Sequence, residues 1–84
     1  ANVVGCELLN KILLDRFGKR IKELRQSLHL SQEALAERAD VHRTYVGMIE
    51  RGEKNITLSN IDKFSKALGV AMSELLEGID ECND

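Results

Sequence analysis

Apolar residues recur at helical spacing from residue 14 onward. Five of them follow one another at steps of three and four: Leu14, Phe17, Ile21, Leu24 and Leu28. This spacing places them on one face of an amphipathic helix. Residues 3–13 are also rich in apolar side chains, but Gly5 disfavours a helix there. That segment therefore either extends the helix backwards or forms a short helix of its own.

Residues typical of helix ends divide the middle of the chain. Ser31 is a preferred N-cap for a second helix over residues 32–39. Asp40 tolerates the left-handed backbone conformation that stops a helix and turns the chain sharply. A third helix is predicted from about residue 42 to residue 51, where Gly52 ends it.

Two further helices complete the pattern. Thr57 is an N-cap for a fourth helix that ends at Gly69. Its apolar residues keep helical spacing: Leu58, Ile61, Phe64 and Leu68. A fifth helix follows, closed by Gly78, with Met72, Leu75 and Leu76 as its apolar residues. No run alternates with the period of two that a strand requires, so the sequence predicts an all-α fold.

The second and third helices have the proportions of a helix-turn-helix, in which the second helix of the pair enters the major groove of DNA. Ala36 is small enough to let a neighbouring helix approach closely. Leu35, Val46 and Ile49 are expected to fix the angle between the two helices from beneath. The outer face of the third helix is then free to contact DNA.

Length and composition agree with a small folded domain. The chain has 84 residues, 43% of them hydrophobic and 31% charged, which lies within the globular range. No apolar run approaches the roughly 18 residues that a membrane span requires, and no secretion signal is recognisable. We therefore expect a soluble protein in the cytoplasm, without a membrane partner.

Charge is distributed unevenly along the chain. The formal net charge is −2, which at first argues against a nucleic-acid partner. Residues 1–70, however, carry all twelve Lys and Arg against nine acids, a net charge of +3, whereas residues 71–84 carry five acids and no base. The acidic tail is either a solvated terminus or an interaction element. Its negative charge makes the net charge of the chain negative although residues 1–70 are basic.

Catalytic and metal-binding patterns are absent from the sequence. Cys6 and Cys82 lie at opposite ends of the chain, without a CxxC pair or a His at ligand spacing. They are expected to be reduced thiols, with a disulfide or a redox switch as the alternative. No HExxH, nucleophile elbow or Gly-rich phosphate loop occurs. We expect no enzyme, no metal, no cofactor and no small-molecule ligand.

Three linked segments carry a resemblance to a known family. They are Leu30 to Ala36 (LSQEALA), Arg43 to Val46 (RTYV) and Ile49 to Gly52 (IERG). At these separations the chain resembles the Cro/CI-type (Xre) helix-turn-helix regulators over roughly residues 14–77, and within them the controller proteins of restriction-modification systems. The resemblance implies a compact five-helix bundle of the lambda-repressor-like type. The expected organisation is an N-terminal extension over 1–13, the DNA-binding domain over 14–78 and an acidic tail over 79–84.

The resemblance also implies roles for individual residues. Four are expected to read bases: Arg43, Thr44, Tyr45 and Gly47. Five are expected to bind phosphates: Gln32, His42, Arg51, Lys54 and Asn55. Arg25 and Glu50 are expected to form a structural pair. The alternatives for Tyr45 are a phosphate contact and a position that covers the edge of the core. The alternative for His42 is a weak helix cap. Gly47 leaves one reading position without a side chain.

The implied function is sequence-specific regulation of transcription, including that of the protein's own gene. One helix-turn-helix reads only a few base pairs, so we expect a homodimer on a near-palindromic operator. The expected dimer surface contains four residues: Ile61, Val70, Met72 and Leu76. Residues 3–13 are the alternative surface. An antitoxin that binds a toxin and its own promoter is the alternative function.

Overall fold

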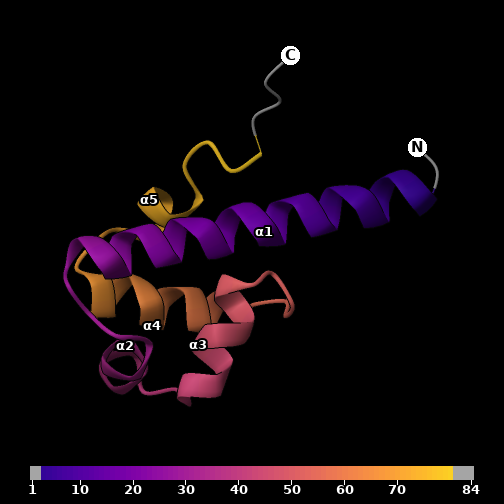
Figure 1. Cartoon of the computed structure of the whole chain (residues 1–84). Helices are drawn as coiled ribbons and strands as arrows, with labels where there is room; N and C mark the ends of the chain where they lie inside the picture. The colour runs from indigo at the N-terminus through magenta and orange to yellow at the C-terminus, as the bar shows by residue number, and fades with distance from the viewer. Residues whose placement is uncertain (1–2, 81–84) are drawn as a thin grey trace.

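The computed structural model describes residues 3–80, and the side chains of residues 10–80. The elements in this part of the chain are five helices: α1 (Val3–Ser27), α2 (Gln32–Ala39), α3 (Arg43–Glu50), α4 (Leu58–Leu68) and α5 (Met72–Leu76) (Figure 1). The all-α prediction is confirmed. Cys82 lies outside the described residues, as does the side chain of Cys6, so the interpretation of both thiols stays a prediction.

The first helix is one continuous element. α1 runs for 25 residues through Gly5 and through the expected boundary at residue 13, and its first turns extend past the other helices (Figure 1). Residues 3–13 therefore extend the helix backwards. The prediction that Leu28 belongs to the apolar face of this helix was wrong, because α1 ends at Ser27 and Leu28 is exposed. The apolar stripe is covered only as far as Leu24, which packs against the core.

Local capping determines where the shorter helices begin and end. The Ser31 hydroxyl accepts the N–H of Ala34 at 3.0 Å, and the Thr57 hydroxyl accepts the N–H of Asn60 at 3.2 Å. Asp40 adopts the left-handed conformation with φ 57°, and Gly69 ends α4 with φ 71°. These ends agree with the sequence prediction. α3 is one residue shorter at each end than predicted, because its flanking residues act as caps.

One hydrophobic core joins the helices. α1 packs against α3, α4 and α5, and α2 packs against α3 and α4. Fully buried side chains fill the centre: Ile21, Leu35, Val46, Ile49, Phe64 and Leu75. Burying one such side chain stabilises the fold by about 1.5–3 kcal/mol. One apolar residue of α4 is not part of the core. Leu58 shares the helical period of the buried residues but is 70% exposed.

Two arginines of α1 hold the C-terminal end of α5. Arg20 donates from Nη1 to the carbonyl of Glu74 at 2.6 Å and from Nη2 to that of Glu77 at 2.9 Å. Arg16 donates to the carbonyl of Ile79 at 2.9 Å. The last carbonyls of a helix have no partner within it, so these bonds fix α5 and the residues after it to α1.

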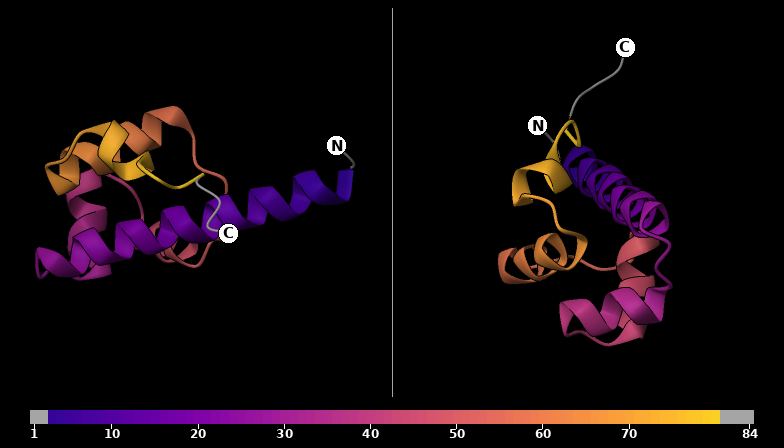
Figure 2. Two further views of the ribbon diagram at one scale, coloured as in Figure 1. Left: turned by 90° about the horizontal axis from the view of Figure 1, so that it is seen from above. Right: turned by 90° about the vertical axis from the view of Figure 1, so that its left-hand side faces the viewer.

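The two ends of the bundle are separate. α2 and α3 lie on the opposite side of the molecule from α5 (Figures 1 and 2). Within residues 3–80 no helix is both long enough and apolar enough to cross a membrane.

Candidate DNA-binding surface

A tight turn sets α3 across α2. Asp40 donates its N–H to the carbonyls of Ala36 and Glu37, and Val41 donates to Ala36 at 3.0 Å. Ala36 and Ala39 are buried, so the backbones approach closely there. In Figure 1 α2 is seen end-on while α3 runs across the view, so the two helices cross. This arrangement presents one face of α3 to solvent.

The first turn of α3 is capped by an imidazole. His42 accepts the N–H of Thr44 at its Nδ1, at 3.1 Å. The side chain therefore satisfies one of the free N–H groups at the start of the helix. Both His42 and Thr44 are exposed. The cap that the sequence left as an alternative for His42 is present, and the side chain remains accessible.

Five of the expected DNA-binding residues meet at one shallow hollow on the exposed side of α2 and α3. Its lining consists of Gln32, Arg43, Thr44, Gly47 and Arg51. Four of these residues come from α3 or its C-cap, and Gln32 is the first residue of α2. The structure therefore brings together residues that lie up to 19 positions apart in the sequence.

Both arginines of this hollow have an acidic neighbour. Nη1 of Arg43 lies 3.5 Å from Oε2 of Glu33, and Nε of Arg51 lies 3.0 Å from Oε2 of Glu53. All four side chains are more than half exposed. Exposed pairs of this kind contribute about 0–1 kcal/mol, so either arginine can exchange its partner for DNA at little cost.

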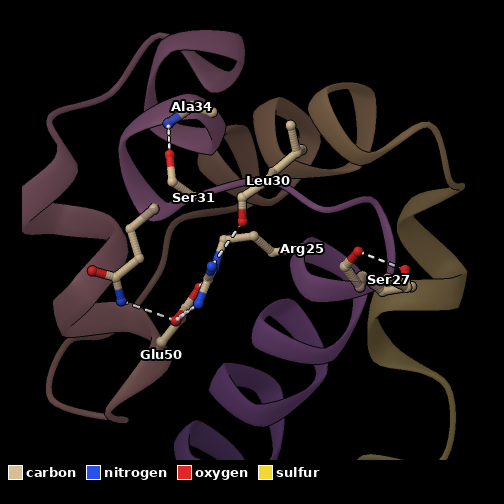
Figure 3. A network of polar contacts seen from close by, with 8 residues as sticks. Arg25, Ser27, Leu30, Ser31, Ala34 and Glu50 are labelled. Atoms are coloured by element: carbon tan, nitrogen blue, oxygen red, sulfur yellow. Dashed lines mark hydrogen bonds and ion pairs between the residues drawn. The ribbon is translucent and has the colours of Figure 1, made fainter.

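A buried ion pair lies beneath the hollow and joins α1 to the end of α3. Nε of Arg25 lies 2.6 Å from Oε2 of Glu50, and its Nη2 lies 3.0 Å from Oε1 (Figure 3). Nη1 of Arg25 donates to the carbonyl of Leu30 at 2.8 Å. The two side chains are only 10% and 3% exposed. This geometry is a bidentate pair in which the third nitrogen of the guanidinium is also bonded.

The same carboxylate holds the side chain of Gln32. The amide Nε2 of Gln32 donates to Oε1 of Glu50 at 3.0 Å. Gln32 is exposed and stands at the start of α2. The buried pair therefore also orients a side chain of the surface hollow.

Tyr45 lies away from the hollow, at the edge of the core. Its ring stacks on that of Phe64, with centroids 6.2 Å apart. Its hydroxyl oxygen accepts a hydrogen bond from Nδ2 of Asn60 at 2.9 Å. The position at the core edge, which the sequence left open for Tyr45, is the one that the structure shows. Among the residues that the structure describes, the hydroxyl proton has no acceptor.

The two expected phosphate-binding residues of the loop between α3 and α4 lie outside the hollow. Lys54 and Asn55 are exposed, and the structure does not bring them into the hollow on α3. Asn55 instead lines an apolar groove between α1, this loop, and the end of α5 with the residues just after it. The apolar lining of this groove consists of Leu13, Leu14, Phe17, Ile56, Leu76 and Ile79.

The expected dimer residues are divided between the core and the surface. Ile61 is buried, so it does not form part of an exposed dimer surface. Val70 and Met72 are half-buried against the core. Leu76 is 38% exposed and shares the apolar groove with Leu13, which is 37% exposed. The end of α5 and the N-terminal half of α1, which the sequence offered as alternatives, therefore line one groove.

Sequence reasoning missed two features that depend on contacts between distant segments. Gly18 lies against the end of α3, where a Cβ atom would meet the carbonyl oxygen of Ile49 and lie 2.7 Å from that of Glu50. Arg16 and Arg20 hold the end of α5 from more than 50 residues away. Gly18 in an otherwise strong helix was the available signal for a close approach. The arginines gave no signal of their own.

Comparison with known proteins agrees with this geometry. A helix-turn-helix family model matches residues 21–75. Control protein C.BamHI of Bacillus amyloliquefaciens is 50% identical over 62 residues, which cover 73% of this chain and 76% of that protein. Control protein C.MunI of Mycoplasma sp is 43% identical over 67 residues, which cover 79% and 90%.

A solved structure extends the similarity to three dimensions. The crystal structure of the restriction-modification controller protein C.AhdI from Aeromonas hydrophila superposes with a TM-score of 0.73 at 47% identity, covering 74% of this chain and 94% of that one. Together with the geometry of α2 and α3, these matches show that the chain belongs to the Xre (Cro/CI-type) helix-turn-helix family of DNA-binding transcriptional regulators, which are not enzymes.

Proposed function

We propose that this chain is a restriction-modification controller that binds a near-palindromic operator as a homodimer and regulates its own gene. The observation that carries the proposal is the hollow on α2 and α3, where expected base-reading and phosphate-binding residues meet. Similarity to control proteins over most of their length supports the narrower role. A regulator of this kind acts in the cytoplasm, at the nucleoid.

Base reading is assigned to the start of α3. Arg43 leaves Glu33 and presents its guanidinium to O6 and N7 of a guanine, a bidentate match. Thr44 contacts the neighbouring base edge. The exposed pair between Arg43 and Glu33 is weak enough for this exchange.

Phosphate binding is assigned to residues around the rim of this face. Gln32 holds a phosphate with the amide proton that Glu50 does not use, next to the free N–H groups at the start of α2. His42 donates from Nε2, because its Nδ1 accepts from Thr44. Tyr45 donates its hydroxyl proton, since Asn60 occupies the acceptor side.

The loop after α3 supplies the remaining backbone contacts. Lys54 and Asn55 are exposed there, and Lys54 adds a cation that attracts DNA without reading its sequence.

The homodimer is assigned to the apolar groove between α1 and α5. Leu13 and Leu76 are exposed on one continuous surface with Ile56 and Ile79. α5, which lines one side of this surface, lies on the opposite side of the bundle from α2 and α3 (Figure 2), so two copies that pair through α5 leave both copies of α3 free for DNA. Arg20 holds the end of α5 in the position that pairing requires.

Binding to DNA from upstream of the protein's own gene tests the operator proposal. We expect saturable binding to that duplex, with half-sites about one helical turn or a multiple of it apart. Scrambling one half-site should reduce affinity more than scrambling flanking sequence. Equal affinity for the native and the fully scrambled duplex would contradict the proposal.

Sedimentation of a matched pair of variants tests the dimer surface. Leu76→Glu places a charge in the apolar groove, whereas Leu58→Glu places one at an exposed leucine on another helix. We expect wild type and Leu58→Glu to sediment near twice 9.4 kDa, and Leu76→Glu to sediment as a monomer. A dimer that survives Leu76→Glu would move the interface elsewhere.

A further inference from the structure

We infer that Arg51 is a further base-reading residue, which reaches a guanine through the space that Gly47 leaves on α3. The inference rests on the proposed function and deepens it. The sequence assigned Arg51 only to phosphate binding, and it placed Gly47 among the base-reading residues as a position without a side chain.

The first observation is where the guanidinium lies. A Cβ atom at residue 47 would stand 3.1 Å from Nη1 of Arg51 and 3.7 Å from Oε1 of Gln32. Side chains on a helix lean toward its N-terminus, so residue i+4 covers the turn before it. The guanidinium of Arg51 therefore occupies the position on α3 where a side chain of residue 47 would project.

The second observation is how the guanidinium is oriented. Its Nε donates to Oε2 of Glu53 at 3.0 Å, and within residues 3–80 neither Nη1 nor Nη2 has a hydrogen-bond partner. The end of the fork is thus left free, as a pair of coplanar donors. This is the arrangement that matches O6 and N7 of guanine.

The charge of the site favours a base over a phosphate. Arg51 and Glu53 form an exposed pair of net charge zero, whereas phosphate anchoring draws on uncompensated positive charge and the release of counterions. Glu53 would repel a phosphate brought close to it. A guanine edge carries no net charge and is recognised by the geometry of the two donors.

The neighbours of the guanidinium point to the same role. Arg51 shares its hollow with Arg43 and Thr44, the residues assigned to base edges. The guanidinium of Arg51 lies at residue 47, about one turn along α3 from Arg43, and there it reads a base pair next to theirs. Glu53 is a positioning residue, which holds the fork over Gly47.

Selection from a randomised DNA duplex library, followed by binding isotherms on every single-base substitution of the enriched sequence, tests the inference. Arg51→Lys keeps the charge and removes the fork. We expect it to lose about 5- to 150-fold of discrimination at one base pair of each half-site, the amount a bidentate contact supplies. Its salt dependence should be unchanged.

Two further variants test the geometry around Arg51. Gly47→Ala places a methyl group against Nη1, so it should lose discrimination at that same base pair, while helicity is retained because Ala favours a helix. Glu53→Gln should also lose discrimination there and bind random duplex more tightly, because a negative charge is removed. Lys66→Ala is the matched control, since Lys66 is likewise an exposed cation paired with an acid, Asp62, at 2.9 Å. It should keep every base preference.

Distinct results would overturn the inference. If Arg51→Lys keeps every base preference, and Arg51→Ala weakens enriched and random duplexes equally with a shallower salt dependence, Arg51 is a phosphate contact. If Arg51→Lys and Gly47→Ala lose discrimination at different base pairs, Arg51 does not read its base through the space at Gly47. If wild type enriches no sequence at all, the proposed function fails, and this inference fails with it.

Discussion

The two sides of α3 use the same residue types for opposite purposes. At its junction with α1, Arg25 and Glu50 form an ion pair that is almost fully buried. On its outer face, Arg51 and Glu53 form a pair whose side chains are 57% and 52% exposed. The two pairs differ in burial and in bonding, because Arg25 makes two bonds to its carboxylate and one to Leu30 whereas Arg51 makes one bond to Glu53. The buried arginine holds the fold, and the exposed one remains available to a ligand.

The physical reason lies in the cost of leaving a charge without its partner. Removing one member of a buried pair leaves an uncompensated charge away from water. Removing one member of an exposed pair leaves a charge that water solvates. The junction is therefore sensitive to substitution in its stability, and the outer face in its binding.

The largest expected effect is on the buried pair. Glu50→Ala leaves Arg25 without its carboxylate and also releases Gln32, and should lower the free energy of unfolding by about 3–5 kcal/mol. In a domain of this size each 1 kcal/mol shifts Tm by about 4–8 °C. Thermal melts followed by circular dichroism measure the change. A melt that matches wild type would contradict the structural role of the pair.

Gly18→Ala should break the same junction through sterics. Its Cβ would meet the backbone carbonyls of Ile49 and Glu50, so we expect a loss of about 1–3 kcal/mol even though Ala is the better helix former. Gly47→Ala is the control on the outer face, where the added methyl meets only the end of a flexible side chain. It should stabilise the fold by up to about 1 kcal/mol. Equal effects of the two substitutions on chemical denaturation would remove the distinction between the two sides.

On the outer face, substitutions should change binding and leave stability almost intact. Arg43→Ala should cost about 1–3 kcal/mol on the operator and relax preference at one base pair. Gln32→Ala should weaken operator and random duplex alike, because a phosphate carries no sequence information. Binding isotherms on both duplexes distinguish these patterns. The reverse pattern would show that α3 sits in the groove in another orientation.

The smallest expected effect is on the stability of the exposed pair. Glu53→Ala removes a carboxylate that is half in water, so the free energy of unfolding should change by no more than about 1 kcal/mol. Chemical denaturation of the Glu53→Ala and Glu50→Ala variants under the same conditions compares their free energies of unfolding directly. A loss for Glu53→Ala as large as that for Glu50→Ala would show that burial does not separate the two pairs.

Some parts of the candidate site were predicted from the sequence and others were not. The start of α3 and the hollow around Arg43 and Thr44 agree with expectation because the motif specifies a local turn between two adjacent helices. The sequence left Tyr45 open between a DNA contact and the edge of the core, where its ring stacks on Phe64, and it did not predict the place of Asn55 in the apolar groove. Both depend on which distant segment lies beside them, which the motif does not encode.

The sequence by itself determined that there are helices in these places, and it determined those helix ends that local caps fix. Ser31, Asp40 and Thr57 act through hydrogen bonds or backbone angles within a few residues, so their neighbours in the chain are sufficient to predict them. Only the tertiary structure decided how far each apolar stripe is covered. Leu58 shares the period of buried residues and yet faces solvent, because periodicity gives the direction of a side chain but not the presence of a second helix beside it. Leu28 shares such a period too, but α1 ends at Ser27 before reaching it. The same holds for Arg51, whose role depends on the space above Gly47 and on Glu53.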